Sequence, residues 1–260
     1  MTPFEDSDGD ELTLAMRDLF PTGSIDRVLL VSPPDVIETD NLFNLTFAKQ
    51  RRYANLPPYG LGVLATQLRG IGVEVRIRNL NHYIYKMAQE WDVSVPFEHT
   101  RLWSERLKRA IEEFEPDMIG LTCMFTMTHN SLKHVSQFVR QNYSIPLVLG
   151  GVHITNSTDR IIADIPEADC LFLRESDTSL PRFVEFVEGA RDISELSQLF
   201  ISTVISLTFD RRFSGWLRIT RTQVEYVHIV RLLTTAFGEF FYRLGRTIGW
   251  YCIFRFKGFG

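Results

Sequence analysis

The chain has 260 residues, 45% of them hydrophobic and 23% charged, which is typical of a folded globular protein with one large domain or one domain plus an appendage. Residues 201–260 hold nine Arg or Lys against three Asp or Glu, a net charge of +6, so residues 1–200 carry −10 and the whole chain −4. The acidic body argues against a nucleic-acid-binding protein, and no uncharged apolar run approaches the roughly 20 residues of a membrane helix.

The first part of the chain predicts two strands. Residues 1–24 are acidic and turn-rich, and their apolar residues between Leu12 and Phe20 suit a short helix. The run 27–31 is a buried strand that ends at Ser32-Pro33-Pro34, because proline cannot continue a central strand. A long loop without periodicity covers 35–55 and indicates a functional or disordered segment. A helix then opens at 56–62 and runs to about 71, before a strand over 73–77 whose alternation indicates a half-exposed edge.

The next part predicts three more strands, each followed by a helix-like segment. After an uncertain segment at 81–91 and a helix over 100–114, a strand covers 118–122. The polar residues 126–131 open a helix to about 143, and the buried strand 147–149 ends in Gly150 and Gly151. Helical periodicity follows at 159–165, then a strand over 170–173 and a helix over 180–187.

Strands alternating with helices predict an α/β fold, a doubly wound, five-stranded parallel sheet of Rossmann or flavodoxin-like type. We expect an N-terminal extension at 1–24, the α/β domain at 25–190 and an atypical basic C-terminal extension at 191–260. Beyond about residue 200 the α/β rhythm is lost, although 224–241 suits an amphipathic helix. Two interpretations of this tail stay open: a basic helical extension that docks on the acidic body, or the product of a frame change in the source gene.

The carboxyl ends of the predicted strands share one chemical character. Small residues, hydroxyls and exposed backbone amides follow the strands, with few fixed charges, and parallel strands place these ends at one edge of the sheet. Such an edge suits a large, mostly neutral ligand. The sequence has neither the GxxxxGK[ST] loop nor a GxGxxG after the first strand, which disfavours ATP and NAD and makes a nucleotide-dependent Rossmann enzyme the least favoured class.

Five segments in order resemble one known family. They are 28–34 (VLLVSPP), 57–65 (PPYGLGVLA), 116–122 (PDMIGLT), 148–153 (VLGGVH) and 174–176 (RES). Together they resemble the cobalamin (vitamin B12)-binding domain found N-terminal in B12-dependent radical S-adenosylmethionine (SAM) enzymes. The resemblance implies a corrinoid across the carboxyl edge of the sheet, its nucleotide tail beside the glycine-rich strand end. The implied cofactor-binding residues are Ser32, Pro33, Pro34, Thr122, Met124, Thr126, Gly150, Gly151, Val152, His153, Glu175, Ser176 and Asp177.

The sequence departs from the family pattern in three places. Members that ligate cobalt carry Asp-x-His-x-x-Gly after the first strand, and here Ile37 stands where the ligand imidazole would be, so no metal ligand is expected. Arg174 and Ser176 replace the glycines of the usual Gly-Glu-Gly-Glu turn. The three cysteines, Cys123, Cys170 and Cys252, form no CxxxCxxC, so a [4Fe-4S] cluster and SAM would need a further, downstream domain.

Single residues leave alternatives open. His153 could touch a corrin amide or face, or could be a turn histidine bonded to backbone. His129 and His134 lie five apart, off each other's helix face, so no metal pair is expected, and Cys123 is expected to be a buried structural thiol. The sparse, unpaired cysteines and the acidic N-terminus, which is unlike a signal peptide, predict a cytoplasmic protein without membrane or nucleic-acid partners.

The predicted function is a cobalamin-binding module of a radical SAM-type enzyme, of the methyltransferase or cyclase class. Whether the chain is itself an enzyme is left uncertain, since we expect it to bind the cofactor without turnover and to work with a radical SAM catalytic domain or chain. The alternative is a flavodoxin-like module that has lost cofactor binding and only mediates protein contacts.

Overall fold

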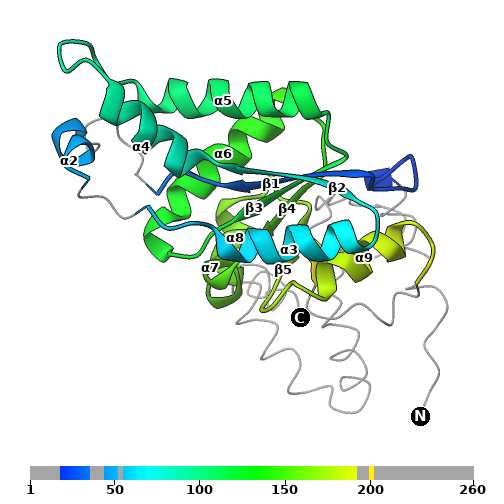
Figure 1. Ribbon diagram of the computed structural model, residues 1–260. Helices are drawn as coiled ribbons and strands as arrows, with labels where there is room; N and C mark the ends of the chain where they lie inside the picture. Colours follow the sequence, from blue (N-terminus) through cyan, green and yellow to red (C-terminus); the bar gives the residue numbers. More distant parts are fainter. Residues whose placement is uncertain (1–17, 36–43, 52–54, 192–198, 202–260) are drawn as a thin grey trace, which may run out of the picture.

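The computed structural model describes residues 18–35, 44–51, 55–191 and 199–201, which build one six-stranded sheet (Figure 1). The strands are β1 (Arg27–Ser32), β2 (Glu74–Asn79), β3 (Met118–Thr122), β4 (Leu147–Gly150), β5 (Cys170–Phe172) and β6 (Leu199–Ile201). Their order is β2-β1-β3-β4-β5-β6, and β1 to β5 are all parallel. The doubly wound parallel sheet predicted from the sequence is therefore confirmed, with β2 at its edge.

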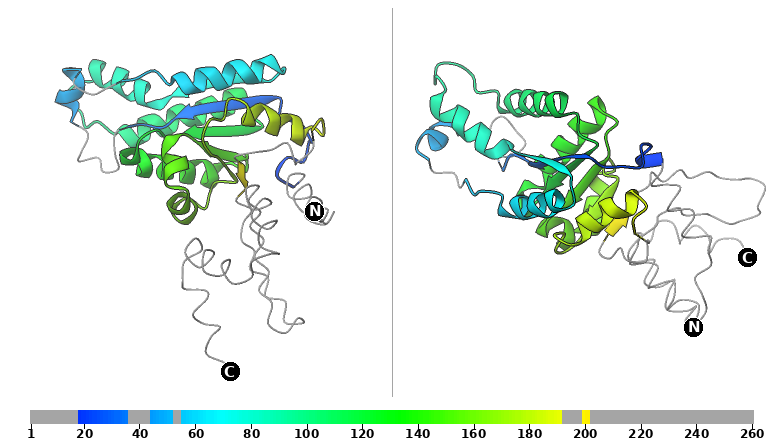
Figure 2. Two further views of the ribbon diagram at one scale, coloured as in Figure 1. Left: turned by 90° about the horizontal axis from the view of Figure 1, so that it is seen from below. Right: turned by 45° about the vertical axis from the view of Figure 1, so that its right-hand side comes forward.

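Helices cover both faces of this sheet. They are α2 (Leu45–Lys49), α3 (Tyr59–Gly70), α4 (Leu80–Glu90), α5 (His99–Phe114), the 3₁₀ turn η1 (Thr126–Thr128), α6 (His129–Asn142), α7 (Val152–Asn156), α8 (Thr158–Asp164) and α9 (Ser179–Val187). Figures 1 and 2 show α5 and α6 on one side of the sheet and α3 and α9 on the other. No helix in the described ranges is long and apolar enough to cross a membrane.

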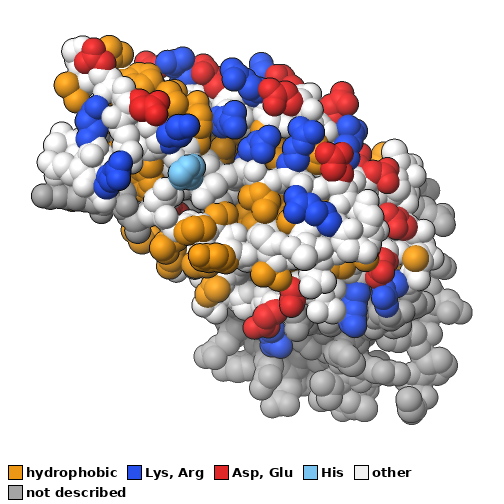
Figure 3. All heavy atoms as spheres, viewed as in Figure 1, with side chains coloured by type: hydrophobic (Ala, Val, Ile, Leu, Met, Phe, Trp, Pro, Cys, Tyr) orange, Lys and Arg blue, Asp and Glu red, His pale blue; other side chains and the backbone are white. Residues whose placement is uncertain are grey.

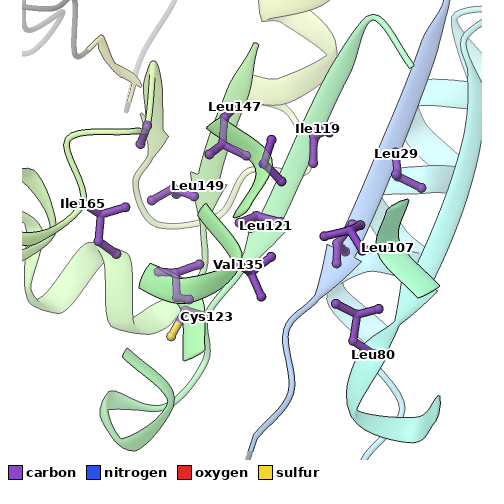
Figure 4. Packing of buried hydrophobic residues seen from close by; sticks show 14 of the residues in the cluster. Leu29, Leu80, Leu107, Ile119, Leu121, Cys123, Val135, Leu147, Leu149 and Ile165 are labelled. Carbon is purple, nitrogen blue, oxygen red and sulfur yellow. The ribbon is translucent and has the colours of Figure 1, made fainter. Parts of the chain in front are cut away.

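Two hydrophobic clusters hold these layers together, one on each face. Alternate residues of a strand point to opposite faces, so Leu29 joins the cluster under α4, α5, α6 and α8, and Leu30 joins the one under α3 and α9. Figure 4 shows the first cluster, which runs from Leu80 and Leu107 across the central strands to Ile165. The continuous apolar runs of β1, β3 and β4 are explained by this burial on both faces.

Carboxylates pin the amino ends of the strands. Asp117, in the turn before β3, accepts hydrogen bonds from the backbone N–H groups of Asp26 and Arg27 at 3.0 and 2.8 Å. Asp169, before β5, accepts one from the backbone N–H of Leu147 at 2.7 Å and one from Arg140 Nη2 at 2.6 Å. Each carboxylate thus satisfies donors at the start of the neighbouring strand, and sets the register at the edge opposite the predicted site.

The structure contains elements that the sequence did not predict, among them α7, which precedes the predicted helical segment 159–165. A short helix, α2, lies within the predicted loop 35–55, where the Asn44 side chain accepts from the backbone N–H of Phe47. Strand β6 lies beyond residue 190 and pairs antiparallel with β5, so the chain past the predicted boundary still contributes to the sheet. Ile37, the first part of the short helix expected between Leu12 and Phe20, and the segment 224–241 lie outside the described residues.

We predict that Asp169→Ala lowers the free energy of unfolding by about 2–3 kcal/mol, because it leaves a buried N–H and a half-buried guanidinium without their shared acceptor. Denaturant unfolding followed by circular dichroism measures the change. Glu105→Ala is the control, since it removes an exposed ion pair with Arg101 and should shift stability by less than about 0.5 kcal/mol. Equal effects of the two substitutions would contradict the role assigned to Asp169.

Candidate functional site

The carboxyl ends of β1, β3, β4 and β5 lie side by side and bring the predicted site residues to one edge. In the sheet register Val31 pairs with Leu121, Thr122 with Gly150, and Gly150 with Phe172. The strand order reverses between β1 and β3, whose crossover helices α3 and α6 pack on opposite faces. A crevice at such a reversal is where open α/β sheets bind ligands.

The turn after β4 has a backbone conformation that requires glycine. Gly151 has φ +117° and ψ 172°, a region essentially restricted to glycine, and a Cβ there would lie 2.5 Å from the carbonyl oxygen of Cys123. Two further contacts join the same segments: Cys123 N–H donates to Gly150 at 2.9 Å, and His153 N–H donates to Cys123 at 3.1 Å. Gly150, in contrast, would accept a Cβ with ordinary contacts only.

Uncharged, exposed side chains surround this turn. Met124, Phe125 and Met127 follow β3 and are 45–66% exposed, and Val152 follows Gly151 with 56% exposure. Thr126 is exposed beside them, and Thr122 is half-buried at the strand end. Leu56 and Tyr59, at the start of α3, are 62% and 79% exposed, and Figure 3 shows hydrophobic side chains gathered around this end of α3. The edge is therefore largely apolar although it faces solvent.

The segment after β1 is held against α4. Ser32 is half-buried, and Pro33 and Pro34 are buried. Asp35 N–H donates to Asn81 Oδ1 at 3.0 Å, and Asn81 Nδ2 donates to Asp35 Oδ2 at 2.7 Å. Burial raises the pKa of the Asp35 carboxyl. This paired contact fixes where the chain leaves the sheet, just before the position of Ile37.

In the turn after β5, a residue other than glycine has a backbone conformation that glycine adopts most easily. Arg174 has φ +60°, the left-handed region that glycine adopts most easily, and its N–H donates to Thr155 Oγ1 at 2.7 Å. Ser176 Oγ lies 4.0 Å from where a Cβ of Gly150 would stand, so this turn borders the turn after β4. Glu175 and Asp177 are exposed. Arginine thus occupies a position whose backbone conformation matches the glycine of the family pattern.

The sequence did not predict the buried histidine pair behind the diglycine turn. His153 Nε2 lies 3.0 Å from His129 Nδ1, and His129 Nε2 lies 3.1 Å from Asp164 Oδ2. His129 and His153 are only 2% and 1% exposed, so the imidazole of His153 is buried against His129 of α6 rather than open at the edge. A signal was available for the pair, since both residues follow the carboxyl ends of neighbouring strands.

Both imidazoles are held neutral. Burial lowers the pKa of His129 below its ordinary value of 6.5, with a further lowering by Arg160 that the contact with Asp164 opposes. Burial also lowers the pKa of His153, and the neighbouring His129 adds to this effect. A hydrogen bond from Arg160 lowers the pKa of Asp164, so this carboxylate stays ionised. The group is therefore one carboxylate and two neutral rings.

Other groups near the edge fit structural roles. Cys123 is buried, its Sγ lies 3.2 Å from Thr128 Oγ1, and burial raises the pKa of its thiol, as expected for a structural cysteine. Within the described ranges no three His, Cys, Asp or Glu side chains form a group that could hold a metal ion. A shallow cavity of about 290 Å³ lies between α2 and α4, lined by Ala48, Arg51, Asn55, Tyr85 and Gln89. None of the predicted residues lines it, because they form an open edge.

This arrangement fits a broad, neutral macrocycle with amide side chains. The exposed Met124 and Val152 offer apolar contact, and the Gly150–Gly151 backbone allows close approach without a side chain. His153 Nδ1 is a buried polar atom without a hydrogen-bond partner in the described part of the chain, and could receive an amide N–H. The fold is thus that of a doubly wound α/β domain with a candidate ligand site at the carboxyl ends of its strands.

Comparison with known proteins identifies the family. Residues 46–184 match the model of the B12 binding domain, which is more than half of the chain. The chain therefore belongs to the B12-binding domain family, as the sequence motifs predicted.

Individual relatives are much longer proteins. The cytidylyl-2-hydroxyethylphosphonate methyltransferase of Streptomyces wedmorensis is 24% identical over 164 residues, which cover 63% of this chain and 29% of that protein. The radical SAM methyltransferase TsrM from Kitasatospora setae has a similar fold in two structures, one with tryptophan and a SAM analogue bound and one with cobalamin and a [4Fe-4S] cluster bound. Each gives a TM-score of 0.51 at 19% and 18% identity, covering 69% of this chain and 29% of TsrM.

We predict that Gly151→Ala destabilises the domain by about 2 kcal/mol or more, because the new Cβ would overlap the Cys123 carbonyl in a conformation that alanine rarely adopts. Gly150→Ala is the matched control, and should change the free energy of unfolding by less than about 1 kcal/mol. Urea unfolding of the two variants tests the difference. Equal stability of Gly151→Ala and the unmodified chain would show that the turn is not constrained as described.

We also predict a pH dependence of stability from the histidine pair. Below pH 6.5 an unfolded chain binds protons at His129 and His153 that the folded chain excludes, so the stability present above pH 6.5 is lost as the pH falls. The free energy of unfolding should fall by on the order of 1 kcal/mol between pH 7 and pH 5. The double variant His129→Gln, His153→Gln should show a weaker dependence, whereas His134→Gln, at an exposed position of α6, should retain it. A steeper loss in the double variant would refute the assignment.

Proposed function

We propose that this domain binds a cobalamin across the carboxyl edge of its sheet, as part of an enzyme of the B12-dependent radical SAM class. The observation that carries the proposal is the family match over residues 46–184 together with the uncharged edge, where apolar side chains stand exposed around the diglycine turn. A monomeric domain seldom exposes such a group of apolar side chains without a ligand or partner to cover it. The flavodoxin-like protein-interaction module is not favoured, because the family match is to a B12-binding domain.

In the proposed complex, residues from four strand ends would surround the cofactor. Thr122, Met124, Thr126 and Val152 would contact the macrocycle, with Gly150 and Gly151 allowing its close approach beside β4. Ser32, Pro33 and Pro34 would border it on the β1 side, and the turn Glu175–Asp177 on the β5 side. His153 would act through its backbone and one ring nitrogen, since its side chain is buried. A bound cobalamin supplies a cobalt centre that can carry a methyl group.

The catalytic part of the proposal comes from the relatives. This chain spans 29% of the length of the phosphonate methyltransferase and of TsrM, and its three cysteines include no cluster motif. We therefore propose that the domain holds the cofactor for a radical SAM catalytic domain or chain, and that a [4Fe-4S] cluster and SAM belong to that partner. A cytoplasmic location, a domain boundary near residue 190 and a methyltransferase or cyclase reaction are parts of the same proposal.

Titration of the full chain with hydroxocobalamin tests the cofactor. We expect the corrin absorbance to change saturably and the melting temperature to rise with ligand concentration, because a ligand that binds only the folded state stabilises it by mass action. Flavin mononucleotide serves as the control ligand and should produce no shift. A melting temperature and corrin spectrum that stay unchanged at high micromolar hydroxocobalamin would refute the proposal.

A further inference from the structure

A chain of hydrogen bonds leads from the surface of α8 to the diglycine turn. Asp164 on α8 bonds to His129 at the start of α6, and His129 bonds to His153 on α7, directly after Gly151 and Val152. The three residues lie 24 and 35 positions apart in the sequence, and the two rings meet edge to face with 5.2 Å between their centroids. Of these three residues, only His153 adjoins the diglycine turn.

The ionised carboxylate sets the direction of every hydrogen bond in the chain. Asp164 can only accept, so His129 Nε2 must carry the proton and donate to it. A neutral imidazole has one N–H, so His129 Nδ1 is an acceptor and His153 Nε2 must carry the proton that it receives. His153 Nδ1 is then left with a lone pair. Geometry and charge together select one tautomer for each ring.

The lone pair of His153 Nδ1 accepts no hydrogen bond from the described part of the protein. His153 Nδ1 is buried and has no hydrogen-bond partner there, a state that folded proteins usually avoid. It belongs to the first turn of α7, whose N-terminal residue Val152 is 56% exposed at the edge. An acceptor kept unpaired behind an exposed turn is explained if a donor reaches it when a ligand settles there.

We propose that Asp164 and His129 are positioning residues that hold His153 as its Nε2–H tautomer, so that Nδ1 accepts a hydrogen bond from a carboxamide N–H of the corrinoid. The inference rests on the proposed function and adds to it a basis for recognising the amide side chains. The opposite tautomer would present an N–H and favour a carbonyl or a carboxylate instead. The chain of hydrogen bonds therefore selects an amide donor.

The charged groups around His129 and His153 favour the same direction of hydrogen bonding. Arg160 on α8 donates to Asp164 Oδ2 at 3.2 Å and keeps it ionised, and Arg160 and Lys133 of α6 both disfavour a proton on His129. If His129 were protonated, its Nδ1–H would face the Nε2–H of His153, and His153 would have to move its proton to Nδ1. Acid would thereby turn the acceptor into a donor.

Nuclear magnetic resonance of the full chain, labelled with ¹⁵N in its histidine rings, tests the tautomers directly. Histidine-to-glutamine variants assign the signals. We expect Nδ1 of His153 to show the shift of an unprotonated nitrogen at pH 7, and to move toward that of a hydrogen-bonded acceptor when hydroxocobalamin is added. His134 lies on the same helix and is exposed, so its signals should not respond.

Binding of hydroxocobalamin to variants gives a second measurement. Asp164→Ala should weaken binding by about twofold, because the two tautomers of His129 then become comparably populated and only one of them leaves Nδ1 of His153 as an acceptor. Asp159→Ala is the matched control, since it removes another exposed carboxylate of α8 that is not part of the hydrogen-bonded series, and should leave the affinity unchanged. Should Asp164→Ala fail to fold, the ring signals of the unmodified chain decide alone.

The outcomes separate the two proposals. If hydroxocobalamin binds and the Nδ1 signal of His153 stays unchanged, or that nitrogen proves to be protonated in the free chain, the inference is overturned while the proposed function stands. If the corrinoid does not bind at all, the proposed function fails and the inference fails with it. A shifted Nδ1 signal together with weaker binding by Asp164→Ala supports both.

Discussion

The close approach of the Gly151 backbone to the carbonyl of Cys123 is the contact on which the site depends. It brings the segment after β4 against the end of β3, at a distance that leaves no space for a Cβ. Two backbone hydrogen bonds, from Cys123 to Gly150 and from His153 to Cys123, make this contact specific. The start of α7 is thereby placed beside the start of α6, and the two buried histidines meet as a consequence.

The two edges of the sheet differ in chemistry because they do different work. At the amino edge, Asp117 and Asp169 accept backbone N–H groups of neighbouring strands, and Arg140 adds a cation that stabilises the second carboxylate. At the carboxyl edge, methionine, valine and phenylalanine side chains are exposed. The contacts that stabilise the sheet and the proposed ligand contacts thus lie at opposite ends of the same strands.

The histidine pair links the surface of α8 to the diglycine turn at the carboxyl edge. Asp164 and Arg160 are accessible on α8, whereas His153 is buried under the turn that faces the ligand edge. In the proposed relay, a carboxylate at the surface would therefore fix the tautomer of a ring that is buried in the free chain. The relatives compared here are about twice as long as this chain, and in the proposed site such a relay would let a small domain define one polar contact without placing a charge in an apolar site.

The sequence by itself determined the five parallel strands, most of the helices between them and the edge at which the strand ends collect. Apolar runs, proline stops and the diglycine after residues 147–149 are local signals, and parallel strands necessarily collect their carboxyl ends at one edge. Helix α2 and strand β6 were missed, because five- and three-residue elements are too short to show a period. The left-handed backbone conformation of Arg174 was not predicted either, because arginine has no preference for positive φ.

Only the tertiary structure decided what His153 does. The sequence offered an imidazole at the cofactor or one bonded to backbone, and the fold placed it against His129, with Asp164 behind. Those contacts depend on which face α6, α7 and α8 pack against and how far each helix is rotated. Such rotations are set by side-chain packing across the sheet, which spacing along the chain does not encode.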